Sequence, residues 1–86
     1  MGLDPDDVEA LGEAARSWRG RVALDFLSRF DTSDLSRNPS SDYTLLDTVI
    51  SYAIASAPLR GMSASIPRLQ RLREKLRPYV EASQQT

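Results

Sequence analysis

The apolar residues of this 86-residue sequence recur at intervals of three and four, the spacing that places side chains on one face of an α-helix. The pattern holds over three segments, which are separated by two stretches rich in Ser, Gly and Pro. The sequence therefore predicts an all-α fold. We expect a small three-helix bundle that forms a single domain over residues 1–86, because a chain of this length supports one core.

The first apolar stripe runs from Val8 to Phe26. Asp4 is placed to cap the helix, and the proline that follows it is favourable in a first helical turn. Because the stripe keeps its phase across Gly20, the pattern favours one long helix over about residues 5–31. Glycine is a poor helix former, so Gly20 is the point at which we expect that helix to bend or split.

The two halves of this first segment differ in how far their apolar residues spread. Residues 22–30 are apolar on almost every side, which is typical of a helix that is buried on more than one side. Before Arg19 the apolar stripe is narrow. We therefore expect the second half to enter the core and the first half to project, with Leu11 and Trp18 available to a partner.

The second segment predicts a helix over about residues 41–57, which Pro58 ends. One half of its circumference is apolar and suits a core. The other half is lined at helical spacing by small uncharged residues: Thr44, Thr48, Ser51 and Ala55. A solvent-facing helix normally carries Lys, Glu or Arg there, so we interpret this strip as a surface that a second backbone approaches closely. The alternative is an ordinary exposed face.

The third segment predicts a helix over about residues 66–77, which Pro78 ends or kinks. A seam of leucines faces the core, and three basic residues flank it on one side: Arg68, Arg71 and Lys75. Such long side chains can lie along the edges of a helix–helix contact, or they can meet phosphates or an acidic partner. We expect the loops at residues 32–40 and 58–65.

The sequence contains no Cys and no His. Disulfides and histidine-based catalysis are therefore excluded, and a structural zinc site has almost no ligands to use. The remaining residues form no recognisable catalytic constellation, so we expect no enzyme activity, no metal and no cofactor. A core this small is marginal on its own, and we expect oligomerisation to complete it.

The net charge of −1 is unevenly distributed along the chain. Residues 1–47 contain ten acidic residues and five arginines, whereas residues 48–86 contain two acidic and six basic residues. The two halves can neutralise each other within one bundle, or they can present opposite charges to a partner. The sequence shows no signal peptide and no apolar run long enough to cross a membrane, so we expect a cytoplasmic protein.

Arg29 falls on the apolar side of the first segment, where a charge requires a partner. We expect a structural ion pair with Asp25, four residues earlier, or with Asp31 or Asp34. The alternative is that Arg29 anchors the carboxylate or phosphate of a ligand, as in a small-molecule sensor with a groove between its helices.

Together these features favour a protein–protein interaction module, such as a small adaptor, a chaperone-like subunit or an oligomerisation domain. We expect the partner to be a second copy of the chain or a larger assembly. The candidate interface combines residues from all three predicted helices: Leu11, Trp18, Thr44, Thr48, Ser51, Ala55, Arg68, Arg71 and Lys75. The alternative is nucleic-acid binding through the Arg-rich helix, against which the net negative charge counts.

Overall fold

The computed structural model describes residues 2–18 and 20–84, apart from the side chains of residues 20–24 and 84. The described residues form four α-helices rather than three: α1 (Pro5–Ser17), α2 (Gly20–Arg29), α3 (Ser40–Ser56) and α4 (Ile66–Gln84). Single turns of 3-10 helix lie in the connections: η1 (Leu35–Arg37), η2 (Pro58–Arg60) and η3 (Ser63–Ser65). No strand is present in these residues, so the predicted all-α class is confirmed.

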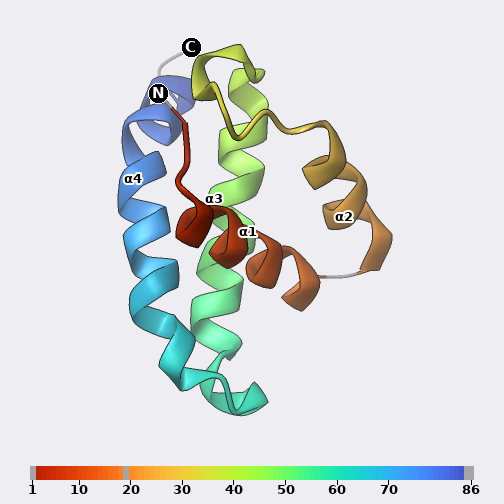
Figure 1. The fold of residues 1–86 in the computed structure, drawn as a ribbon, viewed down its shortest axis with the longest axis vertical. Coiled ribbons are helices and arrows are strands. Elements are labelled where there is room, and N and C mark those ends of the chain that lie inside the picture. The colour runs from red at the N-terminus through yellow and green to blue at the C-terminus, as the bar shows by residue number, and fades with distance from the viewer. Residues whose placement is uncertain (1, 19, 85–86) are drawn as a thin grey trace.

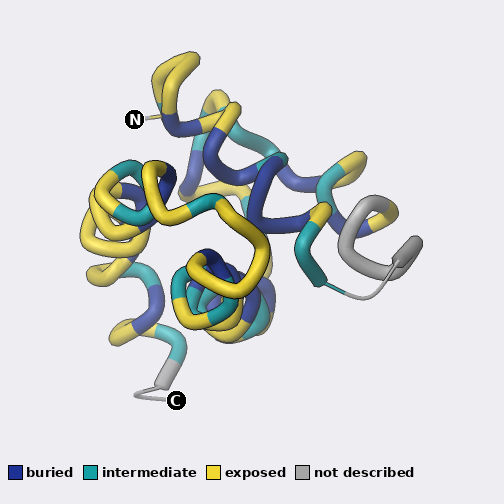
Figure 2. The backbone as a smooth tube through the Cα atoms, turned by 90° about the horizontal axis from the view of Figure 1, so that it is seen from below, coloured by how far each residue is buried: buried dark blue, intermediate teal, exposed yellow. Residues whose placement is uncertain are grey.

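The helices are arranged around an antiparallel pair. α3 and α4 lie side by side along the longest dimension, and the turns η2 and η3 join them at one end (Figure 1). α1 lies across this pair, and α2 lies on the side of α3 that faces away from α4 (Figures 1 and 2). α3 is therefore the central helix, with α1 and α4 against its core side and α2 at its flank.

The core sits where α1, α3 and α4 meet. Leucines of the predicted seam in α4, Leu69, Leu72 and Leu76, are at most 1% exposed. They pack into one cluster with Leu46 and Ile50 of α3 and with small residues of α1. Figure 2 shows that buried residues line the inside of the bundle, whereas exposed residues lie on its outside. The described part of the chain thus closes a core without a second copy.

The prediction of one continuous helix over residues 5–31 is wrong. The chain instead divides near Gly20, the point at which a bend or split was expected. The backbone of Trp18 is extended (φ −83°, ψ 170°), and its N–H donates to the carbonyl of Ala15, which ends α1. Residues of α1 and α2 nevertheless line one cleft against α3. Two separate helices that pack on the same neighbour can share one apolar phase, so the stripe in the sequence did not require a continuous backbone.

The predicted role of the first half is wrong, whereas Phe26 and Phe30 of the second half lie in the core as expected. Ala10, Leu11 and Ala14 of α1 are at most 1% exposed, so the first half lies in the core. Small alanines allow α1 to approach α3 and α4 closely, and this explains how a narrow stripe becomes fully buried. α2 is peripheral: Phe26 is buried, whereas its neighbours Asp25, Ser28 and Arg29 are exposed. The expectation for Val22 lies outside the described side chains.

α4 does not end at Arg77, as expected, but continues through Pro78 to Gln84. A proline inside a helix removes one backbone hydrogen bond and costs about 3 kcal/mol. Packing after the proline offsets this cost. Val80 is buried, and the ring of Tyr79 stacks on Tyr43 of α3 with centroids 5.0 Å apart.

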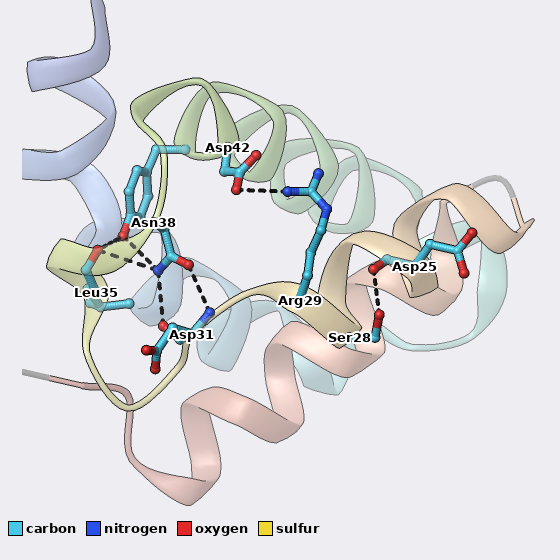
Figure 3. A network of polar contacts seen from close by, with 8 residues as sticks. Asp25, Ser28, Arg29, Asp31, Leu35, Asn38 and Asp42 are labelled. Carbon is cyan, nitrogen blue, oxygen red and sulfur yellow. Dashed lines mark hydrogen bonds and ion pairs between the residues drawn. The ribbon is translucent and has the colours of Figure 1, made fainter.

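The connection between α2 and α3 is held by side-chain hydrogen bonds (Figure 3). The amide of Asn38 accepts from the backbone N–H of Asp31 at 2.8 Å and donates to its carbonyl at 3.0 Å. The hydroxyl of Tyr43 donates to the carbonyl of Leu35, a residue that is itself buried. This loop is therefore a compact structure that fixes where α3 begins.

Candidate interaction surface

The side of α3 opposite the core is the best candidate for a functional site. We call it the outer face of α3, and it consists of the four small residues predicted from the sequence and two larger ones that continue the spacing: Thr44, Thr48, Ser51, Tyr52, Ala55 and Leu59. Leu59 follows in η2, where Ala57 keeps a helical backbone, so the face extends past the end of α3. Its core side carries Leu46, Ile50 and Ala53, all buried.

The outer face exposes two large apolar side chains. Tyr52 is 48% exposed and Leu59 is 91% exposed. Between and before them Thr44, Thr48 and Ala55 are exposed, and Ser51 is half-buried. A continuous uncharged strip with large apolar residues is the kind of surface that marks a contact site on a soluble protein.

Charges near the outer face are held by partners at its borders. Asp47 accepts from Arg73 of α4, with 3.3 Å between Oδ1 and Nε. Arg60 folds back onto α3, where its guanidinium donates to the carbonyl of Ala53 at 3.0 Å and to Oγ of Ser56 at 3.1 Å. A partner could therefore cover the face without burying a charge that lacks a hydrogen-bond partner.

Trp18 supports this face from the side. Its ring meets the ring of Tyr52 edge to face, with centroids 5.3 Å apart and planes at 89°. Trp18 is half-buried and also lines the apolar cleft between α1, α2 and α3. That cleft has a volume of only about 10 Å³, which is room for about one water molecule, so it does not form a ligand site as it stands.

Sequence reasoning missed Tyr52 and Leu59. Tyr52 follows Thr48 by four residues, and Leu59 follows Ala55 by four residues, so the helical spacing contained the signal. The strip predicted from the sequence contained only small residues, and Tyr52 and Leu59 are large. The absence of charge is the property that all six residues share.

The other predicted interface residues lie apart from the outer face of α3. Leu11 is 1% exposed and belongs to the core, so it is not available to a partner in this structure. Of the three basic residues of α4 that were predicted to lie in the interface, Arg68 and Lys75 are directed to acids at the start of the chain. We call this cluster the α1–α4 ion-pair edge, and it consists of Asp4, Asp7, Glu9, Glu13, Arg68 and Lys75.

The edge is built on the capping box of α1. Oδ1 of Asp4 accepts from the N–H of Asp7 at 3.0 Å, which confirms Asp4 as the helix cap. Nζ of Lys75 donates to the carboxylate of Asp7, which is almost fully buried, and lies 3.4 Å from that of Asp4. The backbone hydrogen bond from Asp7 lowers the pKa of Asp4, and the hydrogen bond to Asp7 raises the pKa of Lys75.

Arg68 forms the other half of this edge. Its guanidinium lies 3.7 Å from Glu9 and 3.9 Å from Glu13, both on α1. Arg71 is exposed, and no acid lies within ion-pair distance of it in the described part of the chain. The acidic first half and the basic second half of the sequence thus meet within the bundle, which is one of the two alternatives that the charge distribution allowed.

Arg29 does not pair with any of the acids expected from the sequence. Its Nη1 lies 3.4 Å from Oδ2 of Asp42 at the start of α3 (Figure 3). Its guanidinium stands 5.1 Å from the ring centre of Phe26. The side chain of Arg29 is 60% exposed, whereas that of Asp42 is 9% exposed. Arg29 lies at the end of the peripheral helix α2 and is exposed there, so the pair neutralises the buried carboxylate of Asp42 rather than a buried arginine.

The described residues also bear on metal binding and on membrane crossing. No group of three or more His, Cys, Asp or Glu side chains there is arranged to hold a metal ion. None of the helices in that part of the chain combines the length and apolar character that a membrane crossing requires.

Comparison of this chain with protein-family models, with curated proteins and with solved structures finds no match.

Proposed function

We propose that this protein is a protein–protein interaction module of the cytoplasm and that the outer face of α3 is its contact surface. The observation that supports the proposal is the exposure of Tyr52 and Leu59 on a face without any charged side chain. Aromatic and apolar residues surrounded by small ones offer surface area that a partner can bury at little desolvation cost. Trp18, packed edge to face against Tyr52, adds a second aromatic side chain at the border.

The alternative, nucleic-acid binding through α4, has less support. Lys75 and Arg68 bind acids of α1, Arg73 binds Asp47, and Arg77 lies 2.7 Å from Glu74. Phosphates would have to replace these partners. Among the basic residues of α4, only Arg71 is exposed without an acidic partner in the described part of the chain, and one phosphate contact gives little affinity at physiological salt.

A photo-crosslinking experiment in cells that express the protein tests the proposal. A benzophenone amino acid is placed at Ala55 on the outer face of α3 or, as the control, at Gln70 on the exposed side of α4. We expect ultraviolet light to produce adducts of defined mass from position 55 and none from position 70. Absence of adducts from position 55, in a variant whose helical content is unchanged, contradicts the proposal.

A further inference from the structure

We infer that the occupant of the outer face of α3 is a second copy of this chain, packed so that the two α3 helices run antiparallel and cross near Tyr52. This inference rests on the proposed function and adds the identity and geometry of the partner. Three observations support it: the absence of charged residues on the face, the order of small and large residues along it, and the positions of the two charged residues at its borders.

The absence of charge suits a symmetric contact between identical chains. In a two-fold dimer the same surface meets itself, so any charge near the axis faces an identical charge. The outer face of α3 carries none. At its borders Asp47 is neutralised by Arg73, whereas Arg60 keeps its charge but lies beyond Leu59, so in the antiparallel pair the two copies of Arg60 are at opposite ends of the contact. The face can therefore meet its own copy without repulsion between like charges.

The order of side-chain sizes selects the antiparallel arrangement. The small residues Thr44 and Thr48 lie at the beginning of α3, and the large exposed residue Leu59 lies just past its end. When two such faces run in opposite directions about Tyr52, Leu59 of each copy meets Thr44 of the other. A parallel arrangement would instead place Leu59 on Leu59 and Thr44 on Thr44, so that large residues meet large ones and small residues meet small ones. The macrodipoles of the two helices also favour opposite directions.

The extent of the face sets the strength of the contact. From Thr44 to Leu59 it measures about 22 Å at the helical rise of about 1.5 Å per residue. One helix face on each side gives an interface at the small end of the known range, below about 1,200 Å² in total. Because the core is already closed, with Leu46 and Ile50 at most 2% exposed, the monomer does not need the contact to fold. We therefore expect a reversible dimer.

Cysteine crosslinking tests both the partner and the geometry, because the chain has no cysteine of its own. A short bismaleimide linker is added to purified single and double variants. The antiparallel dimer predicts efficient crosslinking of Tyr52→Cys, which lies at the axis, and of the double variant Thr44→Cys/Leu59→Cys. Thr44→Cys alone and Leu59→Cys alone should give no more dimer than Gln70→Cys, since their two copies lie about 22 Å apart by the helical rise.

Three results would overturn the inference. Crosslinking of both single variants Thr44→Cys and Leu59→Cys indicates a parallel pair. Equal crosslinking of every variant, Gln70→Cys included, indicates random collision. A wild-type chain that stays monomeric in sedimentation at millimolar concentration removes the second copy as the partner.

Failure of the inference can be distinguished from failure of the proposed function. A monomeric chain that still gives photo-adducts from position 55, at a mass other than twice the chain, has a different protein partner, so the proposed function stands. A monomeric chain that gives no such adducts contradicts both the inference and the proposed function. Leu59→Asp changes a residue beyond the end of α3, and Ala55→Arg changes an exposed residue within it. Each should weaken self-association by at least about tenfold, with an unchanged circular dichroism spectrum.

Discussion

Residues of the outer face of α3 and of the α1–α4 ion-pair edge were both predicted to contact a partner, but the two surfaces differ in the contacts they make within the chain. At the edge, Arg68 and Lys75 bind acids of α1, so their charges are neutralised within the chain. On the outer face, Tyr52 and Leu59 stay exposed with no covering element among the described residues. A charge finds its complement within a chain of mixed sign, whereas an uncharged exposed strip remains available to another molecule.

The largest expected effect on stability is at the edge. Asp7→Ala removes an almost fully buried carboxylate that binds Lys75 and closes the capping box with Asp4. A hydrogen bond to a charged group contributes about 1.5–3 kcal/mol, so we expect the free energy of unfolding in urea to fall by about 2 kcal/mol. Asp6→Ala, an exposed acid in the same turn, should cost less than about 1 kcal/mol. Equal losses in the two variants contradict a structural role of the edge.

The next effect separates stability from association at Tyr52. Tyr52→Ala removes the edge-to-face contact with Trp18, and aromatic pairs contribute about 0.5–1.5 kcal/mol. We expect a loss of about 1 kcal/mol in unfolding and a much larger loss of self-association, measured by sedimentation velocity. Trp18 is the only tryptophan, so its fluorescence reports directly on this region. Unchanged association of Tyr52→Ala contradicts the assignment of the outer face.

A pH series sharpens the comparison further. The pKa of Asp4 lies below its ordinary value of 3.8, so its contribution to stability is complete above pH 3.8 and is lost as the pH falls through the lowered pKa. The pKa of Lys75 lies above 10.5, so its contribution is complete below pH 10.5 and is lost as the pH rises through the raised pKa. Asp4→Asn keeps a capping side chain and should remove the contribution of Asp4 to the acidic part of this dependence, leaving that of Asp31 and Asp34, whose pKa values are also lowered by hydrogen bonds.

That pH dependence should belong to unfolding alone. The residues that define the outer face of α3 include no carboxylate and no basic side chain, so we expect the dimer dissociation constant to stay constant as the pH falls from 7 toward the lowered pKa of Asp4, over the range in which the chain remains folded. Chemical denaturation and sedimentation at the same pH values measure the two quantities separately. A dissociation constant that follows the pH profile of unfolding would place the edge, not the outer face, in the contact.

The smallest effect is that of salt. Raising the salt from low to molar concentration shortens the screening length to about 3 Å and weakens the exposed ion pairs of the edge. An uncharged contact should change by less than about threefold in affinity or become slightly tighter. A phosphate-binding surface behaves differently and loses several orders of magnitude over a smaller range of salt. Strong weakening of self-association by salt would contradict an uncharged interface.

The sequence predicted local structure well where one signal dominated. The leucine seam of α4 is buried as expected, Asp4 caps α1, and α3 (Ser40–Ser56) agrees with the predicted helix to within one residue at each end. In each case residues that are close in sequence determine the outcome. These signals fixed where helices form and which side is apolar.

Features that depend on tertiary contacts were predicted poorly. The break at Trp18 was hidden because α1 and α2 pack on the same helix and share an apolar phase. Continuation of α4 through Pro78 depends on Tyr79 meeting Tyr43, two residues far apart in the chain. Arg29 pairs with Asp42, which lies 13 residues later in the chain and comes close only when α2 packs beside α3. For the candidate site, the small residues were found, whereas Tyr52 and Leu59 required the structure.

Sedimentation velocity across a concentration series, for the wild-type chain and for Ala55→Arg, is the most direct test of the central claim. The account predicts that the wild-type chain passes from monomer to dimer with increasing concentration, at low and at high salt, whereas Ala55→Arg stays monomeric with the same stability. A wild-type chain that is monomeric throughout, or an Ala55→Arg variant that dimerises as well as the wild type, would contradict self-association through the outer face of α3.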